Sequence, residues 1–195
     1  MNKKKIIQIG IIIFVIVFVA ICIAIVQFSK KDLEEAKKGL EETQKKYGWV
    51  EKENIDVLVA KFNTQVMDND SSSLNPASTD YLTESNNEYW YGLMEGVYLV
   101  VVPEKYTGDK TTETVNYTLL YVDKTSKYES DAISYIKHLI KANNSEITDS
   151  EIDTLLEDAK TKTNSGKTAN NGKGISIGYT ENDEAYQYQV LRLYK

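Results

Sequence analysis

The most marked feature of the hydropathy pattern is an apolar run near the start of the chain. Residues 6–28 are interrupted only by Gly10 and by Gln8 and Gln27 near the two ends, and three lysines precede the run. At about 1.5 Å per residue, a helix of this length spans roughly 34 Å, enough to cross a hydrocarbon core of about 30 Å. A core helix would have a polar face, which this run lacks. The pattern predicts an uncleaved transmembrane signal-anchor helix.

The sequence leaves two other fates of this run open. Signal cleavage requires small residues followed by a polar start, whereas Cys22-Ile23-Ala24 is followed by two further apolar residues. Lipidation at Cys22 requires a smaller residue before it than Ile21. Lysines on the two sides of the run nearly balance, and we expect residues 1–5 to be a cytoplasmic tail because short basic amino-termini usually stay inside. The remainder is then extracytoplasmic, held at the cell membrane by a single pass.

Residues 29–50 are dense in charge and contain no proline, which predicts a solvated helical stalk. Leu33, Leu40 and Tyr47 recur every seven residues within it. Two heptads fall short of the three to four that indicate a coiled coil. Weak self-association through the stalk is therefore the second interpretation, after a single solvated helix.

Downstream of the stalk, the apolar positions first follow a helical period and then a strand-like one. One stripe predicts an amphipathic helix over residues 55–67, with Asn54 placed to cap it. The stripe consists of Ile55, Leu58, Val59, Phe62 and Val66. After a polar loop at 68–80, strand-like runs follow at about 88–94, 97–102 and 112–122. Their short connections are typical of an antiparallel meander.

The second half of the chain repeats this change from helical to strand-like patterns. Thr148 and Glu151 have the spacing of a capping box, in which each side chain bonds a backbone N–H of the other residue. The helix that they would begin follows another apolar stripe and precedes a loop rich in Gly, Asn and Lys. The two predicted helices and the closing hairpin cover residues 131–142, 149–160, 175–179 and 185–194.

The resulting order, α-βββ-αα-ββ, predicts one α+β domain over residues 51–195. We expect an antiparallel sheet with helices packed mainly on one face. Ile55-Asp56-Val57-Leu58 resembles Ile152-Asp153-Thr154-Leu155, and each begins a predicted helix that a polar loop and a strand pair follow. This similarity suggests a duplicated helix–loop–hairpin unit.

Charge is distributed unevenly along the chain. Residues 1–31 contain five lysines and no acid, so the rest carries 18 basic and 29 acidic side chains, a net charge of −11. Phosphate backbones repel such a domain, and we expect no nucleic-acid partner. Arg192 is the only arginine, a bias towards lysine that is typical of AT-rich bacterial genomes. Cys22 is the only cysteine, so the domain folds without a disulfide.

The short motifs in the soluble part lack residues that their chemistry requires. Ser165-Gly166-Lys167-Thr168 resembles the end of a phosphate-binding loop, but Thr161 stands where the loop needs glycine. Asp68-Asn69-Asp70 resembles the start of a calcium loop, yet the sixth and twelfth positions are Ser73 and Thr79 instead of glycine and glutamate. We therefore predict no cofactor-binding and no metal-binding residue.

The sequence also offers no catalytic residue set. His138 is the only histidine, and its helical projection lies beside Ser134 and Lys141, which predicts a polar, exposed position. The acidic run at residues 181–184 is most simply a hairpin tip. Carboxylate-pair hydrolysis would have enough acids, but 29 of them make some pair inevitable. We predict that the protein is not an enzyme.

Aromatic residues are the most informative group in the soluble part. All fourteen tyrosines lie outside the apolar run, and the run at 97–102 is apolar at every position, whereas a sheet covered on one face should alternate. Either other elements cover the second face, or that face is an open aromatic surface for a partner. The candidate surface consists of Tyr89, Trp90, Tyr91, Tyr98, Tyr117 and Tyr121. Assigning each ring to a face requires the strand register.

These features favour a non-catalytic interaction module. A short tail, one membrane helix and an exported helix-and-sheet domain together resemble the layout of assembly components of bacterial secretion and conjugation systems, a likeness of layout alone. It implies an envelope protein of that type as the partner, with the lipid bilayer contacted through residues 6–28. A domain that binds a glycan or a small ligand at the cell surface is the alternative.

Overall fold

The computed structural model describes residues 34, 35, 37–39, 41, 42, 48, 50–68, 73–163, 167–170 and 172–192. They fall into two compact units, divided between Thr43 and Gln44. The described residues of the first unit are helical and exposed. The boundaries predicted for the tail, the anchor, the stalk and the domain are not tested by this division.

The predicted anchor at residues 6–28 lies outside the described part of the chain, as does most of the predicted stalk. Within the part that the structure does describe, none of the helices combines the length and the apolar character that crossing a membrane requires. The anchor therefore stays a prediction from the sequence.

The second unit combines helices with a seven-stranded sheet. Its helices are α2 (Ile55–Asp68), α3 (Glu129–Asn143) and α4 (Asp149–Thr161), together with the short 3-10 turn η1 (Thr79–Tyr81). Its strands are β1 (Leu82–Ser85), β2 (Glu88–Met94), β3 (Val97–Pro103), β4 (Val115–Asp123), β5 (Ala169–Asn170), β6 (Ile175–Glu181) and β7 (Ala185–Arg192).

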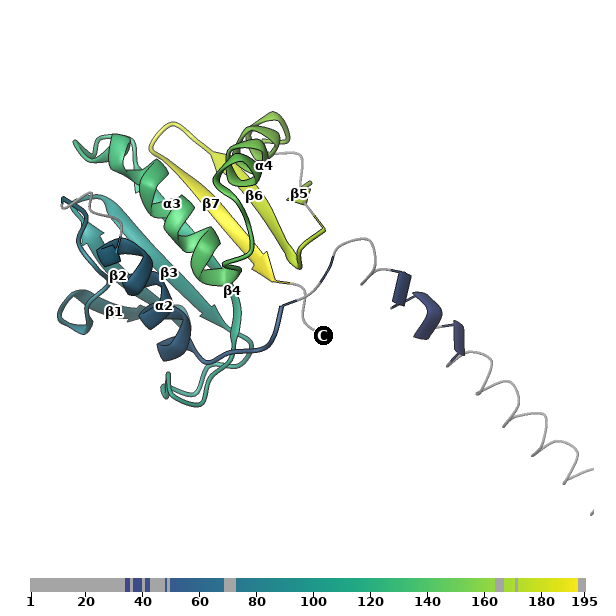
Figure 1. The fold of residues 1–195 in the computed structure, drawn as a ribbon. Helices are drawn as coiled ribbons and strands as arrows, with labels where there is room; N and C mark the ends of the chain where they lie inside the picture. The colour runs from purple at the N-terminus through teal and green to yellow at the C-terminus, as the bar shows by residue number, and fades with distance from the viewer. Residues whose placement is uncertain are drawn as a thin grey trace, which may run out of the picture. The chain divides into compact units, whose positions relative to one another are not determined.

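All strand pairs are antiparallel, in the order β1-β2-β3-β4-β7-β6-β5 (Figure 1). This confirms the predicted α+β class and the antiparallel sheet. The predicted order of helices and strands is also present, with two unpredicted edge strands added. β1 has four residues and β5 has two, too few to show an alternating pattern in the sequence.

The three helices lie on one side of the sheet (Figure 1) and build the core there. α3 packs against α2, β4 and β7, while α4 packs against β5 and β6. The alternate strand residues beneath them are buried, and they form one cluster with the apolar stripes of the helices. Its largest fully buried side chains include Tyr89, Tyr91, Tyr135, Tyr188 and Phe62.

The helix starts follow the predicted chemistry in one case and differ in another. The capping box of α4 is confirmed: Thr148 accepts from the Glu151 backbone, and the Glu151 carboxylate accepts from the Thr148 N–H at 2.8 Å. Glu151 also pairs with Lys173 at 2.9 Å, and these bonds lower its pKa to about 2. Asn54 behaves differently, because its side-chain amide donates to the Thr111 carbonyl. It ties the start of α2 to a loop.

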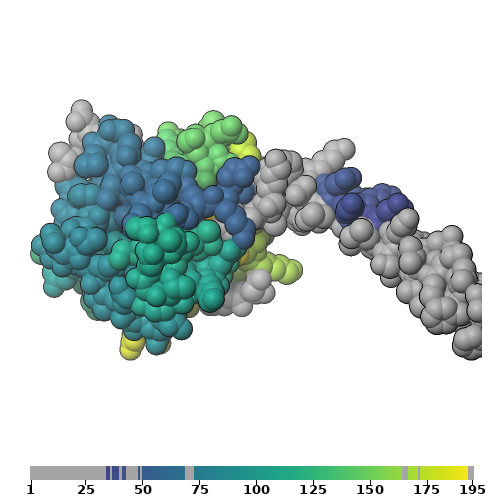
Figure 2. All heavy atoms as spheres, turned by 90° about the horizontal axis from the view of Figure 1, so that it is seen from below, coloured from purple at the N-terminus to yellow at the C-terminus, as the bar shows by residue number. Residues whose placement is uncertain are grey.

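That loop, residues 104–114, is organised by one buried carboxylate. Glu113 is 4% exposed and accepts hydrogen bonds from the Tyr89 hydroxyl at 2.6 Å and the Gly108 N–H at 2.8 Å, as well as from the Thr107 N–H. Burial raises its pKa, but the hydrogen bonds outweigh burial and hold the pKa below its usual value. The loop lies against the segment that leads into α2 (Figure 2), where Lys52 pairs with Glu104 at 2.7 Å.

A buried ion pair joins the beginning of the domain to its last strand. Arg192 of β7 pairs with Glu53 at 2.6 Å, and their side chains are 1% and 9% exposed. The guanidinium also donates to the Asn143 side chain at 3.0 Å and to the Glu51 carbonyl at 3.2 Å. Arginine suits this position because its planar fork reaches several acceptors at once. The pair fixes the chain just before α2.

The predicted duplication of a helix–loop–hairpin unit is not what the sheet shows. α2 precedes β1-β2-β3 and α4 precedes β5-β6-β7, so the element order does repeat. However, β3 and β7 both run antiparallel to β4, which lies between them, and the helices lie on one side. Copies of one unit must superpose by a rotation, whereas these two units are related by a reflection across β4. The similar tetrapeptides share a helix-start pattern rather than a repeated fold.

The exposed position predicted for His138 is wrong. The side chain lies on the sheltered side of α3 and is 8% exposed, and its Nδ1 atom has no hydrogen-bond partner among the described residues. Burial lowers its pKa, Lys141 lowers it further, and Asp149 acts in the opposite direction. The projection failed because α3 is covered by more than the sheet: α2 and α4 both pack against it, which widens its buried face.

Replacement of a core ring should separate buried from exposed positions on α2. Phe62 is fully buried and stacks on Tyr135 with 6.2 Å between ring centroids, so we expect Phe62→Ala to lower the free energy of unfolding by about 3–5 kcal/mol. Val57 on the same helix is 47% exposed, and Val57→Ala should change it by less than about 0.5 kcal/mol. Urea denaturation measures both. Equal effects would contradict the orientation of α2.

His138 should also make stability depend on pH. Its pKa in the folded chain lies below the usual 6.5, so the unfolded chain binds the proton more readily. Stability from this group is fully present above pH 6.5 and is lost as the pH falls from 6.5 through the lower pKa of the folded chain. We expect urea midpoints to decrease from pH 7.5 to 5.5, and His138→Leu to flatten this slope. Because the chain has no other histidine, an unchanged slope would contradict the burial of His138.

Candidate interaction surface on the open face

The strand register assigns each candidate aromatic residue to a face of the sheet. Trp90 pairs with Val100, Val100 with Leu119, and Tyr98 with Tyr121, so these side chains share the face opposite the helices. Among the described residues of this unit, Figure 1 shows no helix on that side. We call it the open face.

Three rings form a cluster at the centre of the open face, the aromatic triad of Trp90, Tyr98 and Tyr121. Their centroids are 6.0 Å apart for Trp90–Tyr98, 5.8 Å for Trp90–Tyr121 and 6.2 Å for Tyr98–Tyr121. The interplanar angles are 58–65°: Trp90 meets Tyr98 edge to face, and the other two pairs are tilted. Inclined contacts of this kind stabilise aromatic pairs. All three rings are half-buried and keep surface for a ligand.

The triad has an apolar floor and a polar anchor. Val100 is fully buried and Leu119 is 9% exposed, although both belong to the open face. The indole N–H of Trp90 donates to the Glu88 carboxylate at 3.1 Å, and this hydrogen bond holds the indole ring over the neighbouring part of β2. Tyr117 lies further along the same face, half-buried, and burial and the Glu88 charge raise its pKa. The ring contacts and the hydrogen bond to Glu88 therefore hold the triad together within the chain itself.

Two residues of the predicted surface lie elsewhere. Tyr89 and Tyr91 alternate with Trp90 and face the helices, where they are 0% and 2% exposed. Burial and the Glu113 hydrogen bond raise the pKa of Tyr89, and burial raises that of Tyr91. The physical reason is the period of two along a strand, which sends neighbouring residues to opposite faces. That the open face binds a partner stays a prediction, and it now rests on Trp90, Tyr98, Tyr117 and Tyr121.

The open face divides into an aromatic half and a polar half. On β7 and β6, the residues that share this face are Gln187, Gln189, Leu191, Ser176, Gly178 and Thr180. Leu191 is the one large apolar side chain among these six residues, and the aromatic rings of the face lie on β2, β3 and β4. A partner that binds through apolar contacts would therefore centre on the triad.

A hollow adjoins the triad at the β1 edge, and we call it the Gly92 groove. Gly92 pairs with Tyr98 on the open face and has no side chain to fill its position. The hollow has a volume of ≈ 670 Å³. Asn75 holds its outer wall by donating from its side chain to the Leu93 carbonyl at 3.0 Å, and the Asn75 N–H donates to the Tyr135 hydroxyl at 2.7 Å. Its lining includes Tyr81, Gly92, Met94, Tyr98, Asp80 and Glu95.

Sequence reasoning missed this groove. Tyr81 is 71% exposed and precedes the unpredicted strand β1, so no pattern placed it next to Tyr98. The available signal was Gly92, a glycine inside a strand, which indicates close approach of another group or space left for a ligand.

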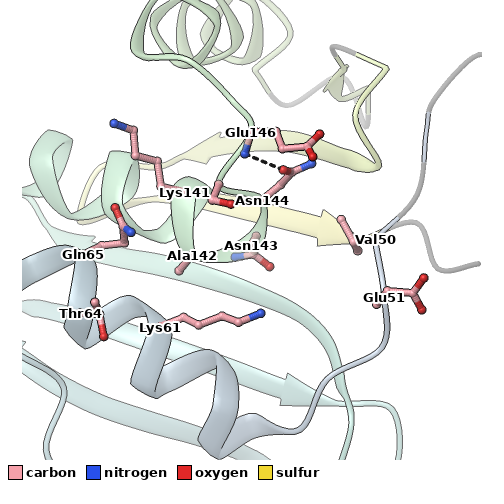
Figure 3. A pocket seen from close by; sticks show the side chains of 11 residues that line it. Val50, Glu51, Lys61, Thr64, Gln65, Lys141, Ala142, Asn143, Asn144 and Glu146 are labelled. Carbon is pink, nitrogen blue, oxygen red and sulfur yellow. Dashed lines mark hydrogen bonds between the residues drawn. The ribbon is translucent and has the colours of Figure 1, made fainter.

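A second hollow, of ≈ 480 Å³, lies between α2 and the carboxyl end of α3 (Figure 3). α2 contributes Lys61 and Gln65, and α3 contributes Lys141 and Asn143. Both lysines are already paired, Lys61 with Glu53 and Lys141 with Asp149 at 2.7 Å. Asn143 accepts from the buried Arg192, so this hollow belongs to the ion-pair network that fixes the domain's first residues.

The remaining candidate motifs have structural roles or lie outside the described residues. At the acidic run, Asn182 accepts from the N–H groups of Glu184 and Ala185, which confirms a hairpin tip. Residues 69–72 and 164–166, parts of the calcium-like and phosphate-like motifs, fall outside the described residues. Among the residues that are described, no three His, Cys, Asp or Glu side chains are grouped to hold a metal ion.

Comparison of the chain with protein-family models, with curated proteins and with solved structures finds no match. The open face and its groove are therefore interpreted from their own chemistry.

Proposed function

We propose that the protein is a non-catalytic interaction module, anchored in the cell membrane through residues 6–28, whose open face binds an envelope protein of secretion or conjugation type. The observation that carries this proposal is the aromatic triad on a sheet face without helices. Interface hot spots are enriched in Trp and Tyr that lie over a packed apolar floor, as the triad does over Val100 and Leu119.

The geometry of the rings favours a protein over a glycan. Sugars stack on exposed ring faces, whereas the triad rings meet at 58–65° and cover part of each other. The neighbouring Gln187 and Gln189 could hydrogen-bond a sugar, which is the observation in favour of the glycan alternative. An apolar surface on a partner protein would contact both the tilted rings and the apolar residues beneath them, Val100 and Leu119.

Charge supports the proposed placement. The residues after position 31 carry a net charge of −11, so anionic lipid headgroups repel the domain. The domain would then stand away from the bilayer on its stalk, with the open face accessible to another protein. His138 lies in α3 on the opposite side of the sheet, where it cannot act on a ligand at the open face.

Photocrosslinking in living cells tests the proposal without disturbing the triad. Gln187 pairs with Tyr121, so a photoreactive residue at position 187 should form one discrete adduct with a partner. Trp90→Ala should remove most of that adduct, because losing a hot-spot ring costs about 2 kcal/mol or roughly thirtyfold in affinity. Val57→Ala should leave it unchanged.

The control position is Glu157, which is exposed on α4 on the helix side. No adduct is expected from it. Equal adducts from positions 187 and 157, or an adduct from position 187 that Trp90→Ala leaves unchanged, would contradict a partner site on the open face.

Topology is tested separately. Protease added to intact spheroplasts should digest residues 30–195, because the proposed anchor exports everything after it. Immunodetection of an amino-terminal and a carboxyl-terminal tag measures this. Protection of the carboxyl-terminal tag would reverse the orientation, and a mature amino-terminus near Ile25 would establish signal cleavage instead.

A further inference from the structure

We propose that the Gly92 groove receives a lysine or arginine side chain from an extended segment of the partner protein. This rests on the proposed function and deepens it, since it names the chemistry of the segment that binds beside the aromatic triad. The argument uses the shape of the groove, its aromatic walls, its charge and its continuity with the triad.

The shape of the groove follows from one missing side chain. A Cβ atom at Gly92 would meet only Tyr81 within 4 Å, at 3.4 Å from its Cβ and 3.6 Å from its carbonyl oxygen. The backbone there does not adopt a positive φ, so the glycine is not required by strain. Its structural consequence is that Tyr81 lies close against the Gly92 backbone, so that Tyr81 and Tyr98 both line one hollow of ≈ 670 Å³.

The walls suit a long cationic side chain. Tyr81 and Tyr98 both line the groove, and Tyr81 is 71% exposed, so its ring is accessible. Ring faces attract ammonium and guanidinium groups. The methylene stem of a lysine or arginine can lie along the rings while its charged end stays near water.

The charge of the groove has one sign. Asp80 and Glu95 line it, and no basic residue is among the described residues that form its lining. Glu95 faces Lys127 at 3.8 Å, but both side chains are more than two-thirds exposed and screened by water. The strand residues of the open face next to the groove include one further charged side chain, the acidic Glu88, and no lysine or arginine. A cation is therefore favoured over an anion or a neutral side chain.

The groove and the triad share Tyr98, which sets the spacing of the partner's residues. From Gly92 to Tyr121 the register crosses two strand spacings, or about 10 Å. An extended chain covers this distance in about three residues. Because alternate residues of an extended chain point to the same side, the partner segment should carry a basic residue two or four positions from an apolar or aromatic one.

A synthetic peptide can test this with the full chain in neutral detergent micelles. The probe is acetyl-Thr-Thr-Lys-Thr-Val-Leu-Thr-Thr-amide, and its counterpart has glutamate in place of lysine. Chemical-shift titration should show saturable changes at Gly92, Tyr81 and Tyr98 with the lysine peptide only. Asp80→Asn should weaken binding roughly three- to tenfold. Gly92→Leu, which fills the groove, should weaken it at least about tenfold.

Asp183→Asn is the matched control, because it removes the same charge from the exposed β6–β7 turn. It should change affinity less than about twofold. The inference is overturned if the lysine peptide does not bind, if Asp80→Asn and Asp183→Asn weaken it equally, or if Gly92→Leu binds as the wild type does. Thermal unfolding of each variant shows whether the fold is kept, and Asp80→Asn decides the question if Gly92→Leu is unfolded.

Failure of this inference and failure of the proposed function are distinguishable. If Trp90→Ala removes the crosslink from position 187 while Asp80→Asn and Gly92→Leu leave it unchanged, the open face binds a partner without a basic side chain in the groove. If position 187 forms no specific crosslink, the proposed function fails.

Discussion

The structure depends on covering a seven-stranded sheet with helices on one side only. Burial of the apolar helix stripes against β2, β3, β4, β6 and β7 builds a continuous core, and tyrosines with raised pKa values, such as Tyr135 and Tyr186 at about 12, are part of it. The same arrangement leaves the opposite face without helices. On the aromatic half of that face, the packed rings cover the apolar residues beneath them, and Val100 is fully buried there as a result. The surface that we propose for a partner is thus a consequence of the way the core is built.

Two charged clusters hold the parts that the core does not reach. Glu113 organises the 104–114 loop and connects it to Tyr89, while Glu53 and Arg192 join the start of the domain to β7. At Gly48, whose φ is positive, any Cβ would collide with the backbone of Gly172 and Lys173. The chain around Gly48 therefore packs closely against residues 172–174, just before β6, ahead of the start of α2.

The open face shows how far sequence reasoning could go. Residue types alone singled out six aromatic positions, of which Trp90, Tyr98, Tyr117 and Tyr121 share one face while Tyr89 and Tyr91 share the other. The division required the register, because a shift of one residue exchanges the two groups. Tyr81 and Asp80 could not be placed at all, since they join the groove only through the short strand β1, which has no periodic signal.

The sequence by itself determined the α+β class, the helices, the long strands and the capping box, because local periodicity and capping chemistry are properties of neighbouring residues. Tertiary structure decided which residues of different elements meet. It buried His138 on α3, excluded a rotational repeat through the common direction of β3 and β7, and gave the single arginine a buried partner. These outcomes depend on strand order and helix packing, which bring together residues as distant as Glu53 and Arg192, and no local pattern encodes such a distance.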